Sequence, residues 1–146
     1  MLIALIGESC SGKTTLAEAL QRRSGAQIVT GKDYLRLAKS EGEAERLFRQ
    51  RLQDALAGED LIYVLSEPEL LRLLPEGTIR VLVQADPETI RARFRVRMHG
   101  NLPAPVAQML EKKHGIFDGG DYEYRFDGVA GDLEELCRAL FSGKEA

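Results

Sequence analysis

The sequence lacks the residues on which several classes of protein depend. It contains no tryptophan, and only two of its 146 residues are cysteine and two are histidine. Cys10 and Cys137 lie far apart and have no metal-ligand spacing, so the sequence offers neither a disulfide framework nor a zinc-binding pattern. A function that depends on structural disulfides or on a cysteine–histidine metal site is therefore excluded.

The chain also lacks a large excess of charge of either sign and has no long apolar run. The 20 basic and 23 acidic residues leave a net charge of −3, which gives no electrostatic basis for binding nucleic acid or an anionic membrane. No apolar run approaches the ~20 residues of a membrane-spanning helix. The run that begins at residue 2 ends at Gly7, too short for the apolar part of a signal peptide. We therefore expect a cytoplasmic protein, and the sequence makes no prediction of its oligomeric state.

What the sequence does contain is a glycine-rich loop at residues 7–14. Its sequence, Gly-Glu-Ser-Cys-Ser-Gly-Lys-Thr, fits the pattern G-x-x-x-x-G-K-[S/T] without a mismatch. The apolar run 2–6 before it is typical of a buried strand, and Leu16, Ala19 and Leu20 recur after it at helical spacing. This order of strand, loop and helix predicts a loop whose amide groups surround a polyphosphate. The residues expected to bind the nucleotide are Gly7, Ser9, Cys10, Ser11, Gly12, Lys13, Thr14 and Thr15.

Two side chains of this loop have direct roles in phosphate chemistry. We expect Lys13 to reach the β- and γ-phosphates and Thr14 to place its hydroxyl on Mg²⁺. The helix that begins at about residue 13 points the positive end of its dipole at the same phosphates. Cys10 is either a reactive thiol or merely a small residue that the loop tolerates. The expected cofactors are ATP and Mg²⁺.

Apolar and amphipathic segments alternate along the whole chain. Strands are expected at residues 2–6, 26–30, 60–65, 78–84 and 122–127. Helices are expected at residues 13–23, 32–39, 41–57, 67–74, 87–98, 104–115 and 132–142. This alternation predicts an α/β fold, with three α/β/α layers around a five-stranded parallel sheet. No linker divides the chain, so residues 1–146 are expected to form one domain.

Ligands bind such sheets at the carboxyl ends of the strands, and the segments found there resemble those of known kinases. Residues 30–36, Thr-Gly-Lys-Asp-Tyr-Leu-Arg, are similar to the acceptor-binding Thr-Gly-Asp-x-x-Arg of adenylate kinases, with one extra residue. Residues 85–88, followed by Arg93 and Arg97, resemble the segment that leads into the lid of those enzymes, and residues 122–124 resemble the end of guanylate kinases. The chain therefore resembles the P-loop nucleoside and nucleotide kinases, a group that includes adenylate, guanylate, cytidylate and shikimate kinases.

This resemblance implies a P-loop NTPase fold and transfer of the γ-phosphoryl group of ATP to a small-molecule acceptor. It also implies that Arg93 and Arg97, which share one helix face, contact the transferring phosphate, unless they are ordinary surface arginines. Residues 97–105 contain glycine and proline and are expected to form a mobile lid. Together with Lys13, these two arginines are the predicted catalytic cations.

The region 32–58 is expected to form the acceptor-binding helices. Within it, Asp33 would orient or deprotonate the acceptor hydroxyl and Arg36 would bind an anionic part of the acceptor. The alternative for these two residues is a surface ion pair. Thr30 and Glu67 complete the predicted acceptor-binding set.

Position 67 departs from the family pattern. Related proteins carry an acidic residue at the end of the third strand that holds Mg²⁺ through water, but here the strand is followed by Ser66 and Glu67, with no aspartate. Either Glu67 substitutes for that residue, or Ser66 or Glu67 simply caps the helix that begins at Pro68. Two other functions stay open. One is a nucleotide-binding switch or ATPase without an acceptor, and the other is a non-catalytic ATP-binding domain, which the missing aspartate favours.

Overall fold

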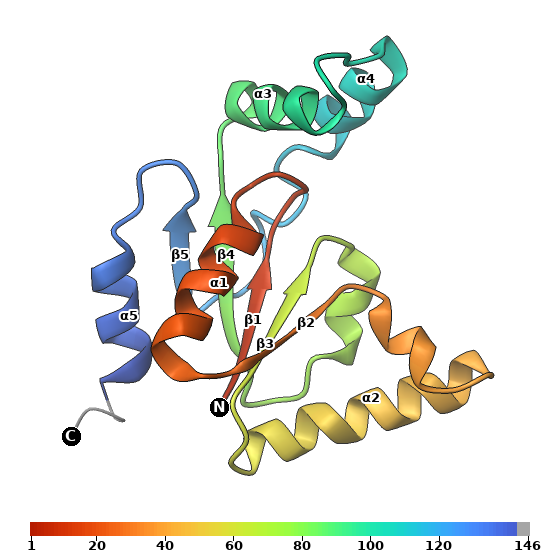
Figure 1. Cartoon of the computed structure of the whole chain (residues 1–146), viewed down its shortest axis with the longest axis vertical. Coiled ribbons are helices and arrows are strands. Elements are labelled where there is room, and N and C mark those ends of the chain that lie inside the picture. The colour runs from red at the N-terminus through yellow and green to blue at the C-terminus, as the bar shows by residue number, and fades with distance from the viewer. Residues whose placement is uncertain (143–146) are drawn as a thin grey trace.

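Five parallel strands form the centre of the structure, a computed structural model that describes residues 1–142 (Figure 1). The order of the strands is β2-β3-β1-β4-β5, and every neighbouring pair is parallel. Their bounds are Leu2–Ile6 for β1, Gln27–Thr30 for β2, Leu61–Leu65 for β3, Ile79–Gln84 for β4 and Tyr124–Asp127 for β5. The predicted parallel sheet is confirmed, and its central strand β1 leads directly into the phosphate loop, residues 7–14.

Helices cover both faces of this sheet. The α-helices are α1 (Lys13–Ser24), α2 (Glu41–Leu56), α3 (Pro87–Arg97), α4 (Ala104–Lys113) and α5 (Leu133–Phe141). Along β1, Leu2, Ala4 and Ile6 join a core that includes α2, whereas Ile3 and Leu5 join a core that includes α1 and α5. Because β1 and β3 are buried on both faces, their sequences are continuous apolar runs. The predicted three-layer architecture is confirmed.

Two of the predicted helices are short 3₁₀-helices instead, namely η1 (Asp33–Leu37) and η2 (Pro68–Leu73). Only three residues separate the end of η1 from α2, so no room is left for further helical turns. The second segment ends at Leu73, and the next residue, Leu74, is extended because it precedes Pro75. Both segments follow strand ends and therefore lie at the edge of the sheet where a ligand is expected.

The helices α3 and α4 project beyond the carboxyl ends of the strands (top of Figure 1). Asp86 accepts a hydrogen bond from the Thr89 amide at 3.0 Å and so starts α3, as the sequence predicts. A small apolar cluster, made of Ala85, Ile90 and Leu110, holds this helix pair together. Cys10 of the phosphate loop packs against the same cluster. The helix pair is therefore attached directly to the loop.

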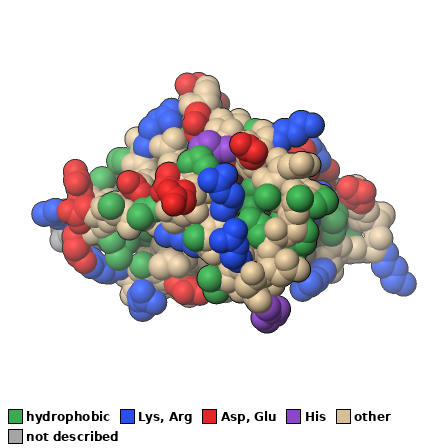
Figure 2. Space-filling view, turned by 90° about the horizontal axis from the view of Figure 1, so that it is seen from above, with side chains coloured by type: hydrophobic (Ala, Val, Ile, Leu, Met, Phe, Trp, Pro, Cys, Tyr) green, Lys and Arg blue, Asp and Glu red, His purple; other side chains and the backbone are tan. Residues whose placement is uncertain are grey.

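The outer surface shows no dominant charge. Acidic and basic side chains are interspersed over the face seen in Figure 2. Among residues 1–142, no helix is long and apolar enough to cross a membrane.

Candidate active site

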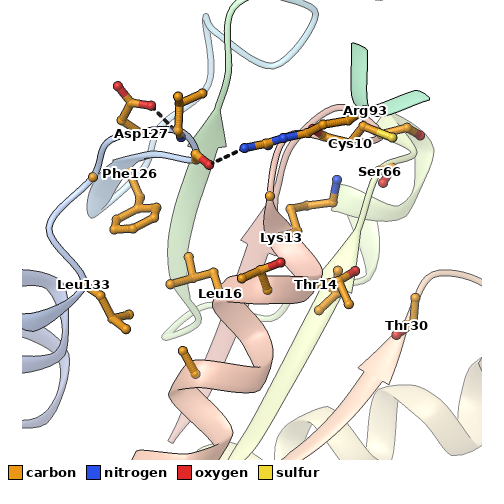
Figure 3. A pocket seen from close by; sticks show the side chains of 18 of the residues that line it. Cys10, Lys13, Thr14, Leu16, Thr30, Ser66, Arg93, Phe126, Asp127 and Leu133 are labelled. Atoms are coloured by element: carbon orange, nitrogen blue, oxygen red, sulfur yellow. Dashed lines mark hydrogen bonds between the residues drawn. The ribbon is translucent and has the colours of Figure 1, made fainter. Parts of the chain in front are cut away.

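A cavity of about 590 Å³ lies at the carboxyl ends of the strands (Figure 3). Its floor is the phosphate loop and the first turns of α1. Of the loop residues predicted to bind a nucleotide, Gly7 and Ser11 are buried beneath the floor. The others line the cavity, namely Ser9, Cys10, Gly12, Lys13, Thr14 and Thr15.

The backbone of the phosphate loop turns sharply where α1 begins. Gly12 is the N-cap of α1 with φ 110°, a left-handed conformation that favours glycine. Cys10 also has a positive φ, 66°, which is uncommon for a residue with a side chain. These two turns hold the loop against the cavity and place the amino end of α1 at its floor, an arrangement that attracts anions.

Lys13 is the buried cation of the cavity, with only 5% of its surface exposed. Its Nζ donates a hydrogen bond to the backbone oxygen of Glu8 at 2.6 Å. Burial lowers the pKa of Lys13 from 10.5 to about 8, although the nearby negative groups of Cys10, Glu67 and Glu8 act in the opposite direction. Since its bonded partner is a neutral carbonyl, the ammonium group has no ion-paired carboxylate and suits an anionic ligand.

Arg93 connects three parts of the site. Its Nη1 donates to the backbone oxygen of Cys10 at 3.1 Å, and its Nη2 donates to that of Gly128 at 2.9 Å (Figure 3). The Gly128 amide in turn donates to the Gln84 oxygen at 2.6 Å. One guanidinium group thus joins α3, the phosphate loop and the loop that follows β5.

The cavity has an apolar side next to β5. Asp127 shapes this side, because its Oδ1 accepts hydrogen bonds from the amides of Val129 and Ala130 at 2.8 and 3.2 Å. No role was predicted for this loop from the sequence, although the Asp-Gly pair directly after a strand is typical of a turn. The residues of the apolar side are Leu16, Ala19, Phe126, Val129 and Leu133.

The opposite, polar side of the cavity lies at the ends of β2 and β3. It is made of Thr30, Gly31, Val64, Ser66 and Glu67. Glu67 occupies the N-cap position of η2, but its side chain makes no capping hydrogen bond. Its carboxylate instead accepts a hydrogen bond from the Ser66 amide at 3.3 Å and lies on the cavity wall.

Comparisons with known proteins agree with this geometry. No family model matches the chain. A shikimate kinase of Pelotomaculum thermopropionicum is 27% identical to the chain in an alignment 143 positions long, and the alignment covers 83% of each protein. The structure of a shikimate kinase from Acinetobacter baumannii in complex with shikimate matches 99% of this chain and 94% of its own, with a TM-score of 0.65 and 19% identity.

A deoxyadenosine kinase from M. mycoides, with dCMP and dCDP as bound products, matches 99% of each chain with a TM-score of 0.55 and 16% identity. The chain is similar to P-loop kinases. The fold of this kinase-like chain is the one that the sequence predicts.

The structure separates the other predicted site residues of this kinase-like protein into two groups. Thr30, Glu67, Arg93 and Arg97 line the cavity together with Lys13. Asp33 and Arg36 are exposed on η1 and are not part of the cavity wall. Their roles in binding an acceptor stay predictions.

A contact of the phosphate loop that the sequence analysis missed involves Glu8. Its carboxylate lies 3.1 Å from Nδ1 of His114 and accepts a hydrogen bond from the Gly115 amide, also at 3.1 Å. These residues follow α4, so the carboxylate ties the end of the projecting helix pair to the loop. The contact spans 106 residues of sequence and has no local signature.

The bridge made by Arg93 leads to a prediction for this kinase-like protein. In Arg93→Ala we expect the phosphate loop to lose its attachment to the Gly128 loop, which should weaken nucleotide binding about tenfold. The lost charged hydrogen bonds should also lower the free energy of unfolding by about 1–3 kcal/mol. Calorimetric titration with nucleotide and urea unfolding would measure the two effects.

The matched control is Arg95→Ala. Arg95 lies on the same helix but is exposed and outside the cavity wall. Both measurements should stay at the wild-type values in this variant. Equal losses in the two variants would contradict a specific role for the bridge.

Proposed function

We propose that this chain transfers the γ-phosphoryl group of ATP to a small-molecule acceptor in the cytoplasm, with Mg²⁺ as cofactor. The observation that carries the proposal is the position of Lys13. It is a buried cation on the floor of a cavity that has an apolar side and a polar side. A phosphate chain bound at this floor would lie between a site for a nucleobase and a site for an acceptor.

The apolar side suits the base of the nucleotide. Leu16, Phe126 and Leu133 offer aliphatic and aromatic surface at this end of the cavity, where a flat heterocycle can be buried. The apolar side is close to the floor of the cavity, since Gly128, in the loop after β5, contacts the phosphate loop. We propose that the triphosphate passes from this side onto the amides of the loop.

The residues present also fit Mg²⁺. Thr14 is in the first turn of α1, exposed, and part of the cavity wall. Among residues 1–142, no cluster of three or more His, Cys, Asp or Glu side chains could hold a metal by itself. The ion would therefore take one ligand from the Thr14 hydroxyl and the others from phosphate oxygens and water, as Mg²⁺ prefers in nucleotide sites. When bound, it supplies charge neutralisation on the β- and γ-phosphates.

The transfer itself needs positioning and positive charge more than covalent help from the protein. An acceptor oxygen forms a bond to the γ-phosphorus while the bond from that phosphorus to the bridging oxygen breaks, and ADP leaves with the electron pair. Lys13 stabilises the negative charge on the phosphates. Arg97 is exposed, lines the cavity, and lies near enough to Lys13 for its charge to lower the pKa of the lysine. We propose that it neutralises the transferring group.

The lowered pKa of Lys13 predicts how nucleotide binding depends on pH. Below pH 8 the side chain carries its charge, and above this value it becomes neutral in the free protein because burial disfavours the ammonium form. Affinity for a non-hydrolysable ATP analogue should therefore be constant near pH 7 and fall by up to about tenfold per pH unit above about pH 8. Calorimetric titration between pH 6.5 and 9.5 would measure the affinity.

The control for the pH profile is Lys13→Arg. A guanidinium group keeps its charge over this whole range, so the affinity of the variant should not fall above pH 8. A wild-type profile that is flat up to pH 9.5 would contradict the prediction.

A screen for acceptors tests the proposed function. ADP release would be followed with ATP, Mg²⁺ and a panel of nucleosides, nucleotides, sugars and hydroxy acids. The proposal expects ADP release that depends on one class of acceptor. ADP release that no acceptor accelerates would instead favour an ATPase or switch, and stabilisation by ATP without turnover would favour a non-catalytic binding domain.

A further inference from the structure

The polar side of the cavity is built from hydroxyl groups and one carboxylate. Thr30 and Ser66 contribute the hydroxyls and Glu67 the carboxylate. Hydroxyls donate and accept hydrogen bonds, whereas an ionised carboxylate only accepts them. Among the described residues, the only hydrogen bond to the Glu67 carboxylate comes from the Ser66 amide at 3.3 Å. This carboxylate can therefore accept further hydrogen bonds from a ligand.

Among residues 1–142, no cation belongs to the polar side. The basic residues of the cavity wall are Lys13, Arg93 and Arg97, which come from the phosphate loop and α3. A bound triphosphate would neutralise these three cations, so they would offer little net positive charge to a second anion. An acceptor that carries its own negative charge would find no unoccupied counter-charge at the ends of β2 and β3.

The basic residues nearest in sequence to the polar side also leave an anionic acceptor without a counter-charge. None of the lysines and arginines between residues 32 and 72 lines the cavity. Lys32, which directly follows the polar side, pairs with Glu69 at 3.5 Å, and both side chains are more than half exposed. Arg49 and Arg72 both pair with Glu45. Three cations in and near the region expected to bind the acceptor thus form ion pairs outside the cavity.

Glu67 is oriented toward the end of β2. A methyl group added to Gly31 would lie 3.7 and 3.8 Å from the two carboxylate oxygens of Glu67. Because β2 is at the edge of the sheet, this places the carboxylate beside the outer strand end. The carboxylate is also near enough to Lys13 for its charge to raise the pKa of the lysine, so a hydroxyl group bound to it would lie close to the phosphates.

From these observations we infer that the acceptor is an uncharged molecule with several hydroxyl groups, and that Glu67 selects it over anionic acceptors. This inference rests on the proposed kinase function. The carboxylate accepts hydrogen bonds from hydroxyls of the acceptor and repels an acceptor that carries a carboxylate or a phosphate. The acceptor hydroxyl attacks the γ-phosphorus, ADP leaves as described above, and the hydroxyl proton passes to water or to Glu67.

Matched pairs of acceptors test the inference. Each pair shares its hydroxyls and differs in one charge, as in glucitol and gluconate, methyl shikimate and shikimate, or a nucleoside and its 5′-monophosphate. We expect kcat/KM of the wild-type protein to be at least about 30-fold higher for the uncharged member of the accepted pair. In Glu67→Gln this preference should fall by at least about tenfold, because the amide keeps its size and loses its charge.

The matched control is Glu69→Gln. This change removes the same charge from η2, but Glu69 is exposed, pairs with Lys32, and is outside the cavity wall. The preference between pair members should not change in this variant. Melting curves of both variants would show that each is folded, and the ratio within a pair cancels any loss of activity common to both members.

The possible results distinguish a failure of this inference from a failure of the proposed kinase function. A higher kcat/KM for the anionic member would overturn the inference and leave the kinase function in place. Equal losses for both members in Glu67→Gln would also overturn it, since they would assign the carboxylate to Mg²⁺ or to the loop structure. No acceptor-dependent ADP release with any pair would overturn the proposed function itself, and the inference with it.

Discussion

Lys13→Ala is expected to abolish phosphoryl transfer, with a fall in kcat/KM of at least about 10³-fold. The reason is that Lys13 is the cation at the floor of the cavity and is 5% exposed, so no surface side chain can replace its charge there. The variant should remain folded. Its melting temperature should not fall, because removing a desolvated ammonium group relieves the penalty of burying it. Coupled ADP release and thermal melting would measure the two results.

Lys32→Ala is the control for this prediction. Lys32 is also a lysine next to the site, but it is exposed, pairs with Glu69 and does not line the cavity. Turnover in this variant should stay within about twofold of wild type, because an exposed ion pair contributes under about 1 kcal/mol. Lys13→Ala protein that keeps its turnover would remove the basis of the proposed function.

Gly128→Ala is expected to damage both the fold and nucleotide binding. A Cβ at this position would clash with the backbone oxygen of Ser11 and lie 3.2 Å from that of Gln84. These are backbone atoms, so a change of side-chain rotamer cannot relieve the clash, and the phosphate loop has to move. We expect the free energy of unfolding to fall by about 3 kcal/mol, or ~10 °C in melting temperature for a chain of this size. ATP affinity should fall with it, which titration of the folded protein at low temperature would show.

The control for Gly128→Ala is Gly119→Ala. A Cβ on Gly119 would meet no atom within 4 Å. Stability and nucleotide affinity should both match the wild-type protein. If the two variants melted at the same temperature, the close packing of the Gly128 loop on the phosphate loop would not be a feature of the protein in solution.

Strands and long helices could be predicted closely because their signals are local. The apolar runs of β1 and β3 are continuous since both strands are buried on both faces. The helix α3 begins where Asp86 and Pro87 predict it, with the aspartate as a side-chain cap. The 3₁₀-helices were predicted only as helices, because their tight turns depend on the short distance to the next element and on Pro75.

The spacing of Asp33 and Arg36 in the sequence does not determine whether the two side chains face the cavity or the solvent. The two residues are three positions apart, a spacing that brings them onto the same side of a 3₁₀-helix. Which way that side faces depends on Tyr34, whose ring is buried and stacks on Phe48 with centroids 4.9 Å apart. With Tyr34 in the core, Asp33 and Arg36 are turned to the surface. The orientation of η1 therefore depends on the contact of Tyr34 with α2, and the local sequence does not predict that contact.

The phosphate loop could be predicted from local residues alone, because its glycines, its lysine and the flanking apolar residues act on neighbouring backbone and need no distant partner. The contacts of Arg93 with the loop and Gly128, and the position of Glu67 beside Gly31, depend instead on tertiary packing. These contacts join residues separated by 35 to 83 positions for Arg93. They exist because the strand order β2-β3-β1-β4-β5 brings distant strand ends to one edge of the sheet, and that order follows from the packing of the whole chain.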